Sequence, residues 1–529
     1  MDINEFLYNY GYTKDFSLAV CDEVRDIPDM IPESEFKKRK CLFDRQIITI
    51  DGDDSKDFDD AVSITKFKNG KFELGVHIAD VSHYVTEGSA LDAEAYNRGT
   101  SVYLVNHVVP MLPEKLSNNL CSLVPYKPRL TLSCFMKIDS RGNIEDYKIC
   151  ETAIKSSARM TYRNVTKVLE GDMAARNEYS EFTEMFENMR ELALILRDKR
   201  MRRGAVDFDF PEPYFEIDQN GKVIDVYARE ITISNRIIEE FMLAANETVA
   251  RHCEKFAIPC VYRIHEEPDR EKIEKLAAIV RTFGHRLKVK DKVSPKTMQG
   301  LLFRVNGTNA QTVLSTVMLR SMMKARYCED NLGHFGLAAE YYCHFTSPIR
   351  RYPDLIVHRI LKEWLHNSLD ERRITHYNKI TRRASEQSSE TESAATNAER
   401  DYDAYKSCEY MEDKIGQEFI GMISSVTDFG FFVELPNTVE GLVRMTDLQD
   451  DYYEFDENTL MLTGRRNGRV FCMGQQVCIR LAKVNTELKQ IDFVLSEFDS
   501  PKPKKEVRHK DGKQRSRGKK IRKKKHRAK

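Results

Sequence analysis

The sequence predicts an α+β protein: a large domain of one sheet and many helices, then a small β-barrel and a disordered basic tail. Strand-like segments are concentrated between residues 46 and 138, and helical periodicity dominates after about residue 160. Strand-like alternation returns over 416–496, and a low-complexity run rich in Lys and Arg follows it. The length of 529 residues also indicates several domains, because one domain usually has about 150 residues.

Charge is distributed unevenly, although Lys plus Arg and Asp plus Glu both number 83. Residues 501–529 carry a net charge of +14, so residues 1–500 carry a net charge of −14. A basic tail on an acidic body is typical of proteins that bind nucleic acid or a membrane surface. A membrane surface is the weaker alternative, because no amphipathic apolar segment accompanies the basic residues.

Composition excludes several classes of protein. No uninterrupted apolar run reaches the roughly 18 residues that a membrane span needs, and the first residues do not resemble a signal peptide. The 12 cysteines include no Cys-x-x-Cys pair, so nothing supports a zinc ribbon or a thioredoxin-like redox site. We therefore expect a soluble cytoplasmic monomer with reduced thiols and no membrane partner.

The first part of the chain is expected to change from helix to strand. Residues 1–45 have the pattern of a helical lead-in. β-Branched and apolar segments, separated by Asp, Gly and Asn-Gly turns, then predict strands. These strands are 46–51, 61–67, 72–80, 100–105 and 131–138.

Apolar residues at three- and four-residue spacing predict helices farther along the chain. The helices are expected at 235–256, 270–284 and 311–329, with Gly284 and Gly333 as stop positions. The charge-laced segment 380–412 is interpreted either as a long solvent-facing helix or as a linker. The predicted domains are a helical lead-in (1–45), a large domain (46–385), a polar helical connector (386–415), a barrel (416–496) and a tail (497–529).

Six acidic residues within ten positions form the sharpest local feature. The segment reads Asp51-Gly52-Asp53-Asp54-Ser55-Lys56-Asp57-Phe58-Asp59-Asp60. Like charges this close repel each other unless water solvates them or they share a cation. Carboxylate oxygens at this spacing suit Mg²⁺. The alternative is a solvated acidic turn, although apolar Phe58 argues against a flexible loop.

A second cluster, residues 344–359, places two adjacent arginines after Ser347-Pro348, which we interpret as a helix start. Arg350 and Arg351 could present guanidinium groups to a phosphate. The alternative is ordinary ion pairing with Asp354 or Glu363. Acidic metal ligands combined with a phosphate-facing arginine are typical of metal-assisted phosphodiester hydrolysis.

Four long segments resemble the nuclease domain of the ribonuclease II and ribonuclease R family: IDGDDSKDFDDAVSI, GVHIADVSHYV, VVPMLPEKLSNNLCSL and HFTSPIRRYPD. The resemblance covers about residues 40–385 and again 416–496. It implies a processive 3′→5′ exoribonuclease that hydrolyses RNA to nucleoside 5′-monophosphates with Mg²⁺, in RNA decay and quality control. Family members usually carry helical and cold-shock modules before the nuclease domain. We therefore expect a short form or a fragment that lacks the cold-shock modules.

The resemblance implies a role for each residue that matches a family motif. The metal ligands are Asp51, Asp57, Asp59 and Asp60, with Asp57 and Asp59 also counted as catalytic. Asp53 and Asp54 are expected outside the ligand set. Arg350 is the transition-state arginine, and Arg351 is its RNA-contacting neighbour.

The same resemblance implies contacts with the bases and the ribose of the substrate. Tyr103 stacks on the terminal bases of the RNA, with Phe208 as its partner. Tyr162 and one acid of the pair Glu239 and Glu240 contact the 2′-hydroxyl, which distinguishes RNA from DNA. His77 is expected to be structural, because it alternates with apolar residues in a strand.

Residues 416–496 resemble an S1 module, a five-stranded RNA-binding barrel of the oligonucleotide-binding fold. Phe429 and Phe432 match its stacking aromatics, Arg444 stands where a His is common, and Phe431 is expected in the core. The tail is expected to bind phosphates without sequence preference, with the ribosome or structured RNA as possible partners.

Two other interpretations of the function remain open. The chain could be a non-catalytic RNA-binding or ribosome-associated regulator with a vestigial nuclease domain. It could also be an endonuclease or a DNA-directed exonuclease. The complete set of aspartates and Arg350 favours an active exonuclease that takes single-stranded RNA by its 3′ end.

Overall fold

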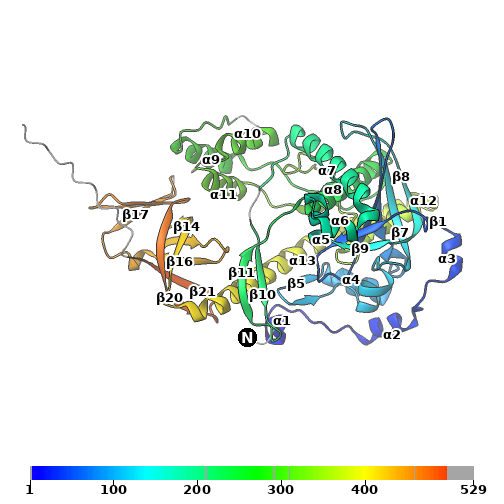
Figure 1. Ribbon diagram of the computed structural model, residues 1–529, viewed down its shortest axis with the longest axis horizontal. Coiled ribbons are helices and arrows are strands. Elements are labelled where there is room, and N and C mark those ends of the chain that lie inside the picture. The colour runs from blue at the N-terminus through cyan, green and yellow to red at the C-terminus, as the bar shows by residue number, and fades with distance from the viewer. Residues whose placement is uncertain (1–2, 209–210, 290–291, 309, 458, 497–529) are drawn as a thin grey trace, which may run out of the picture.

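The computed structural model describes residues 3–208, 211–289, 292–308, 310–457 and 459–496. Figure 1 shows an elongated molecule, with a β-barrel at one end and a helix-covered sheet at the other. The long helix α13 (Glu371–Met411) runs between the two ends. The predicted α+β class is confirmed, whereas the predicted tail at 497–529 lies outside the described residues.

One seven-stranded sheet organises the large domain, with the spatial order β1-β8-β7-β4-β3-β2-β9. Its strands are β1 (Lys40–Cys41), β2 (Ile48–Asp51), β3 (Asp60–Lys66), β4 (Phe72–Ala79), β7 (Pro128–Ile138), β8 (Ile144–Lys155) and β9 (Ala158–Thr161). Neighbouring strands are antiparallel, except that β1 is parallel to β8 and β2 is parallel to β9. The strands predicted at 46–51, 61–67, 72–80 and 131–138 are confirmed.

The central strand β4 is almost fully buried, with Glu73 as its one partly exposed residue. Helices α7 (Thr183–Arg203) and α8 (Ile233–Lys255) pack against the sheet and cover apolar side chains. His77 is fully buried in β4, 3.0 Å from Ser63 Oγ and 2.7 Å from Ser133 Oγ. Burial lowers the pKa of His77 to about 3, so the ring is neutral and its predicted structural role is confirmed.

The lead-in consists of three short helices, α1 (Ile3–Asn9), α2 (Leu18–Asp26) and α3 (Glu33–Lys37). Phe6 and Leu7 of α1 are buried in a small apolar cluster with α13 and with the hairpin of β5 (Val102–Leu104) and β6 (His107–Val109). The segment 100–105 therefore forms a separate two-stranded hairpin and is not part of the main sheet.

The predicted helix at 311–329 is wrong in its second half. Helix α11 (Gln311–Ser321) ends where Met322 adopts an extended backbone, with φ −75° and ψ 156°. Strand β13 (Arg326–Cys328) then pairs antiparallel with β12 (Tyr262–Ile264). Pairing with a distant strand overrides the local periodicity there, so Gly333 lies in a loop and ends no helix.

Other helices surround this framework, and the predicted helices at 235–256 and 270–284 are confirmed. The surrounding helices are α4 (Ala90–Arg98), α5 (Tyr162–Glu170), α6 (Met173–Glu178), α9 (Arg270–Thr282), α10 (Pro295–Val305) and α12 (Tyr352–Leu365). Gly284 follows α9 with a φ of 76°, as expected for a residue that ends a helix. The described residues contain no helix that is both long enough and apolar enough to cross a bilayer.

Of the two alternatives for residues 380–412, the long helix is correct. Helix α13 has 41 residues, and small side chains at Ala384, Ser385, Ser388, Ala395 and Ala398 are buried along it. Such residues let neighbouring backbones approach closely without giving a strong apolar pattern. The helix is continuous through residue 386, where the sequence predicted a connector to begin.

The second domain is a closed five-stranded barrel with the order β14-β15-β16-β21-β20. Its strands are β14 (Glu418–Thr427), β15 (Gly430–Glu434), β16 (Glu440–Arg444), β20 (Gln476–Asn485) and β21 (Gln490–Leu495). The polar insertion forms a three-stranded sheet of β17 (Tyr453–Asp456), β18 (Met461–Gly464) and β19 (Val470–Cys472). Phe431 is fully buried and stacks on Phe471 at 4.8 Å between ring centroids, so its predicted core position is confirmed.

A buried ion-pair network fixes α12 against the sheet. Asp80, 1% exposed, lies 2.6 Å from Arg39 Nη2 and 2.9 Å from Lys362 Nζ of α12. Burial alone would raise the pKa of Asp80, but Lys362 and Arg39 outweigh it and hold the pKa well below its usual value. This network stabilises the helix that follows the two arginines.

Candidate active site

The acidic segment connects the end of β2 to the start of β3, and buried contacts hold it in place. Phe58 is 4% exposed, and its N–H donates to Ser122 Oγ at 3.0 Å. The Ser122 hydroxyl donates in turn to the carbonyl of Lys56 at 2.7 Å. The loop is therefore anchored at its apolar residue, which favours a built site over a solvated turn.

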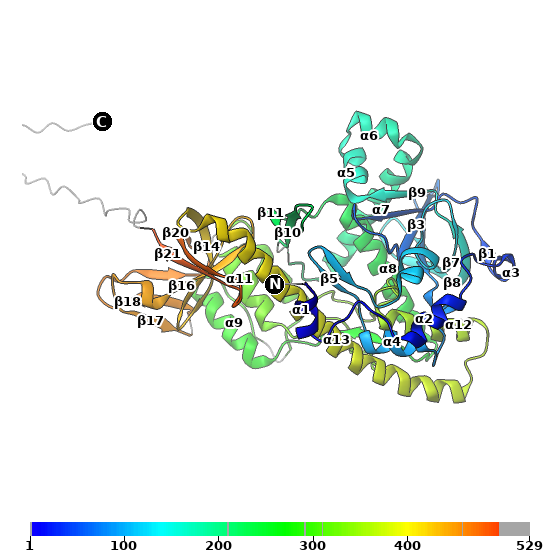
Figure 2. The same cartoon turned by 90° about the horizontal axis from the view of Figure 1, so that it is seen from below.

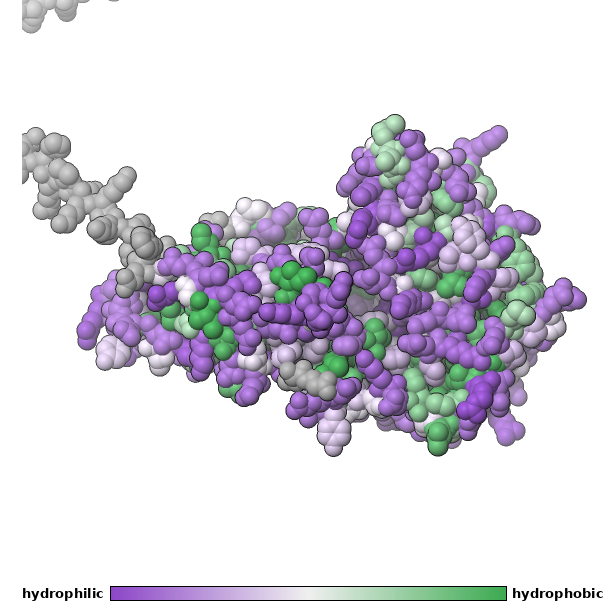
Figure 3. Space-filling model, turned by 60° about the horizontal axis from the view of Figure 1, so that its bottom comes forward, coloured by the Kyte–Doolittle hydropathy of each residue, from purple (hydrophilic) through white to green (hydrophobic). Residues whose placement is uncertain are grey.

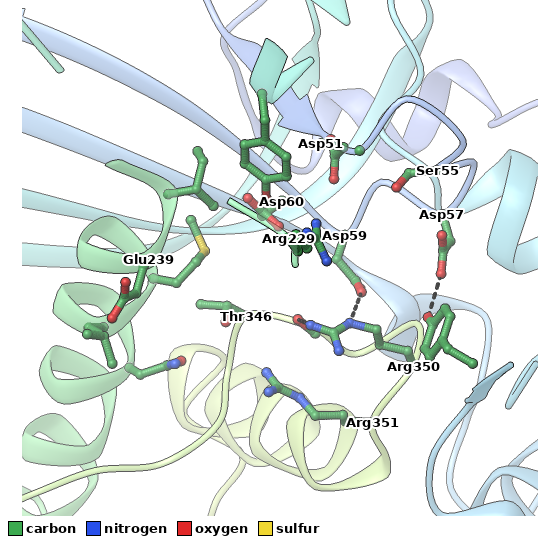
Figure 4. A pocket seen from close by; sticks show the side chains of 18 of the residues that line it. Asp51, Ser55, Asp57, Asp59, Asp60, Arg229, Glu239, Thr346, Arg350 and Arg351 are labelled. Atoms are coloured by element: carbon green, nitrogen blue, oxygen red, sulfur yellow. Dashed lines mark hydrogen bonds and ion pairs between the residues drawn. The ribbon is translucent and has the colours of Figure 1, made fainter. Parts of the chain in front are cut away.

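Four of the six acids line one cavity of about 510 Å³. They are Asp51, Asp57, Asp59 and Asp60, the same four that the family resemblance implies as ligands. Figure 4 shows these carboxylates around the cavity, with Arg350 next to Asp59 and joined to it by a dashed line. Asp53 and Asp54 are exposed, and Asp53 pairs with Arg163.

Burial of these carboxyls is costly while they are charged. It raises the pKa of Asp59 and Asp51 well above the usual value and that of Asp60 to about 6. For Asp51, repulsion by Asp60 and Asp57 adds to the shift. A shared cation would remove both penalties.

The donor set fits a hard divalent cation that keeps part of its water shell. Asp51 Oδ2 and Asp59 Oδ2 are buried and accept no hydrogen bond from the described residues. Across that same part of the chain, no three His, Cys, Asp or Glu side chains meet in a ready-made metal cage. Mg²⁺ needs no such cage, because it is held by few carboxylates together with water and substrate phosphate oxygens.

The turn that carries the two arginines is tied directly to the acidic segment. The N–H of Ile349 donates to Asp59 Oδ1 at 2.8 Å, and Arg350 Nε lies 3.6 Å from Asp59 Oδ2. The Arg350 side chain is 43% exposed and lines the cavity. It can therefore reach an anion bound beside Asp59.

Arg351 also lines the cavity, but its charge is already paired. Its Nη2 donates to the fully buried Asp354 at 2.7 Å, one of the two pairings that the sequence left open. The predicted helix start at Ser347-Pro348 is wrong. Helix α12 begins at Tyr352, and Pro353 occupies its first turn. Asp354 holds the preceding turn by accepting the N–H of Ser347.

Tyr103 closes the cavity from the β5–β6 hairpin. Its hydroxyl donates to Asp57 Oδ2 at 2.8 Å, and its backbone N–H donates to Glu399 of α13 at 2.8 Å. The lining of the cavity also includes Tyr162, at the start of α5, and Glu239, on α8. Asn246, which also lines the cavity, accepts the N–H of Phe345.

The structure separates the two adjacent glutamates. Glu239 lines the cavity, whereas Glu240 is 3% exposed and accepts two hydrogen bonds from Arg200 of α7. Phe208 is not brought to Tyr103. It lines a second cavity of about 840 Å³ beside the barrel, which also includes Ile420 and Met422 of β14.

The barrel residues lie away from the acidic cavity. Phe429 is 51% exposed, and its ring lies 6.2 Å from that of Phe432 at an interplanar angle of 90°. Arg444 lies opposite Gly430 on the neighbouring strand and forms an ion pair with Asp492 at 3.0 Å. The three side chains thus share one end of the β15–β16 region.

Two residues of the site gave no clear signal in the sequence. Arg229 follows strand β11 (Val223–Ala228) and lines the cavity. Glu399 bonds Tyr103 from the middle of a polar helix. Neither occurs in a motif, and only the fold brings them to the site.

Comparison with known proteins places the chain in a family. Residues 39–367 match the RNB domain, and residues 412–496 match the S1 RNA binding domain. The chain is 43% identical to ribonuclease R 1 of Lactococcus lactis, covering 98% of this chain and 65% of that protein. It is 44% identical to ribonuclease R of Thermotoga maritima, covering 92% of this chain and 69% of that protein.

A solved structure gives the same result. Mycoplasma genitalium RNase R in complex with ribose-methylated single-stranded RNA superposes with a TM-score of 0.86 at 28% identity. The match covers 93% of this chain and 77% of the Mycoplasma chain. This chain thus spans about two thirds of the length of the Lactococcus and Thermotoga relatives. With an RNB domain over most of its length, an S1 domain after it and an intact acidic site, the chain belongs to the RNB family, among relatives named ribonuclease R.

Proposed function

We propose that the chain is a processive 3′→5′ exoribonuclease that hydrolyses single-stranded RNA to nucleoside 5′-monophosphates. One observation carries the proposal: Asp51, Asp57, Asp59 and Asp60 share a cavity with Arg350. Membership of the RNB family supports it, because the relatives named ribonuclease R match over nearly the whole chain. A role in RNA decay and quality control follows from this activity.

Each residue of the cavity has a proposed task. The four aspartates would hold Mg²⁺, which supplies charge neutralisation and an activated water when bound. The Arg350 guanidinium stabilises negative charge that develops on the phosphoryl oxygens. Asp59 fixes the turn of Arg350 through the N–H of Ile349, so the carboxylates and the arginine keep one geometry.

Substrate recognition uses the aromatic and polar lining. Tyr103 stacks on the terminal base, and its hydrogen bonds to Asp57 and Glu399 hold the ring at the cavity edge. Tyr162 and Glu239 contact the 2′-hydroxyl, since Glu240 is occupied by Arg200. Arg351 contributes positive potential, although Asp354 offsets part of its charge.

The barrel and the tail are proposed to bring RNA to the cavity. Phe429, Phe432 and Arg444 bind upstream nucleotides, and Phe208 contacts RNA in the second cavity, beside the barrel. The basic tail binds phosphates of structured RNA or the ribosome. The protein acts in the cytoplasm as a monomer.

The direct test uses linear single-stranded RNA labelled at its 5′ end, with Mg²⁺ present. We expect a progressive ladder that ends in a short labelled stub, and no cleavage of circular RNA or of DNA. Binding of RNA without hydrolysis would support the alternative of a non-catalytic regulator. Cleavage of circular RNA would identify an endonuclease, and equal cleavage of DNA would refute the 2′-hydroxyl contacts.

A further inference from the structure

A pair of stacked, exposed tyrosines lies on the hairpin of β10 (Pro213–Ile217) and β11. Tyr214 and Tyr227 face each other across the two strands, with ring centroids 5.0 Å apart and an interplanar angle of 29°. They are 41% and 45% exposed. A stacked pair that stays open to water offers a flat ring face to a ligand.

The hairpin is held firmly against α13, beside which it runs in Figure 1. Lys406 Nζ donates to the carbonyl of Gly221 at 2.8 Å, and the hydroxyl of Tyr410 donates to Asp225 at 3.0 Å. The other face of the hairpin buries Phe215 and Val226. The tyrosines are therefore displayed by a fixed scaffold, and their exposure does not result from a loose loop.

Arg229 links the tyrosine pair to the acidic cavity along the chain. Arg229 extends the strand ladder beyond β11, because its N–H donates to the carbonyl of Glu212 at 2.8 Å. Side chains two residues apart in an extended chain share one side and are about 6.6 Å apart, so Tyr227 and Arg229 lie side by side. Arg229 lines the cavity, and with Tyr162 in the same lining it continues the path from Tyr227 to the aspartates.

Charges on this face are arranged for a phosphate near the cavity. Among the described residues, no acid or carbonyl forms an ion pair or hydrogen bond with the Arg229 guanidinium. Arg163, on α5, is exposed and pairs with Asp53. The acids Glu216 and Asp225 lie opposite each other in the strand ladder, two residues closer to the hairpin tip than the tyrosines and away from Arg229.

Figure 2 shows the hairpin from another direction, between the barrel and the helices α5 and α6. The one molecular face drawn in Figure 3 is mainly hydrophilic, with hydrophobic residues in separate groups. Beside the two tyrosines themselves, the hairpin carries the polar residues Glu216, Asp225 and Arg229. A polar, charged ligand with flat apolar rings matches two stacked rings among charged side chains better than an apolar protein segment does. Single-stranded RNA has this chemistry, and its bases stack on aromatic side chains whatever their identity.

We propose that Tyr214 and Tyr227 form a stacking platform for a nucleobase upstream of the 3′ nucleotide that the acidic cavity holds. Arg229 contacts the phosphate between the two positions. The platform rests on the proposed function, because it takes the cavity to be the 3′-end site. It adds a contact outside the cavity that would slow the loss of RNA between successive cleavages.

The test measures equilibrium binding of single-stranded oligoribonucleotides of increasing length, by fluorescence anisotropy in EDTA, where the RNA stays intact. We compare wild type with Tyr227→Ala, Tyr214→Ala/Tyr227→Ala and Tyr227→Phe. Loss of one stacked base should weaken binding about tenfold. The alanine variants should lose affinity only for RNA that is long enough to extend beyond the cavity. Tyr227→Phe should bind like wild type because it keeps the ring.

Tyr8→Ala is the matched control, since Tyr8 is 83% exposed on α1, outside the cavity lining. Melting temperatures confirm that each variant is folded. If an alanine variant does not fold, Tyr227→Leu replaces it in the binding assay. Equal affinities of wild type and the alanine variants at every RNA length overturn the platform. Hydrolysis by wild type is measured in parallel: if it fails, the proposed function fails, whereas unchanged binding with normal hydrolysis overturns the platform alone.

Discussion

Glu239 and Glu240 are adjacent in sequence, yet the structure predicts opposite consequences of changing them. Glu240 is 3% exposed and pairs with Arg200, which is 6% exposed, through bonds of 2.6 and 3.0 Å. Replacing Glu240 by Ala removes the buried partner of Arg200 and leaves the cation with its longer, 3.3 Å contact to the half-exposed Glu239. Removal of one partner from a buried ion pair costs about 3–5 kcal/mol of stability.

Glu239 is expected to contribute little to the stability of the fold. Its side chain is 43% exposed, and within the described part of the chain its one ion pair is a 3.3 Å contact with Arg200. We expect Glu239→Ala to change the free energy of unfolding by less than about 1 kcal/mol. The variant should instead lose preference for RNA over DNA, because Glu239 lines the cavity.

Urea unfolding gives the two stability changes, and the ratio of kcat/KM for matched RNA and DNA strands gives the discrimination. Glu239→Gln and Glu240→Gln serve as conservative controls that keep side-chain volume. The reasoning is refuted if Glu240→Ala is as stable as wild type, or if Glu240→Ala alters RNA preference while Glu239→Ala does not.

Three further predictions follow from single contacts. Asp80→Asn should lose about 3 kcal/mol at neutral pH, because Lys362 and Arg39 are left buried. The folded pKa of Asp80 lies below its unfolded value, so its contribution to the free energy of unfolding is present above about pH 4 and is lost as the pH falls below that. Urea unfolding should therefore show that the difference in stability between wild type and Asp80→Asn decreases below about pH 4. A difference that stays constant with pH would contradict this. Tyr103→Ala should raise KM for RNA about tenfold in steady-state kinetics, whereas Tyr103→Phe keeps the stacking ring and should stay close to wild type; equal effects would argue against stacking. Phe431→Ala should lower the free energy of unfolding by about 3–5 kcal/mol in thermal unfolding, because Phe431 lies in the barrel core. Phe429→Ala should leave stability nearly unchanged and weaken RNA binding. The reverse pattern would contradict the assignment of Phe431 to the core and Phe429 to the RNA-binding surface.

Much of the sheet could be predicted because its strands carry a local signal. β-Branched runs ending in Asp or Gly turns identify β2, β3, β4 and β7, and anchored Phe58 already suggested an ordered acidic loop. The second half of the helix predicted at 311–329 failed because β13 pairs with β12, a partner more than 60 residues earlier in the chain. Periodicity within a short window carries no information about such a partner.

The site was only partly predictable for the same reason. The four aspartates lie in one contiguous motif, so their convergence could be expected. The sequence did not indicate which of the adjacent acids Glu239 and Glu240 lines the cavity. The packing of α8 against α7 pairs Glu240 with Arg200 and leaves Glu239 in the cavity lining. Phe208 was expected beside Tyr103, but the chain takes it to the cavity next to the barrel.

The most direct test of the central claim is the rate at which Asp59→Asn releases nucleoside 5′-monophosphates from linear single-stranded RNA in Mg²⁺. Asn preserves the size of Asp59 and an oxygen that can accept the N–H of Ile349, and it removes the charge from the most deeply buried carboxylate of the cavity. The account predicts a fall of at least about 100-fold with RNA affinity and melting temperature retained. An unchanged rate of 5′-monophosphate release would contradict it.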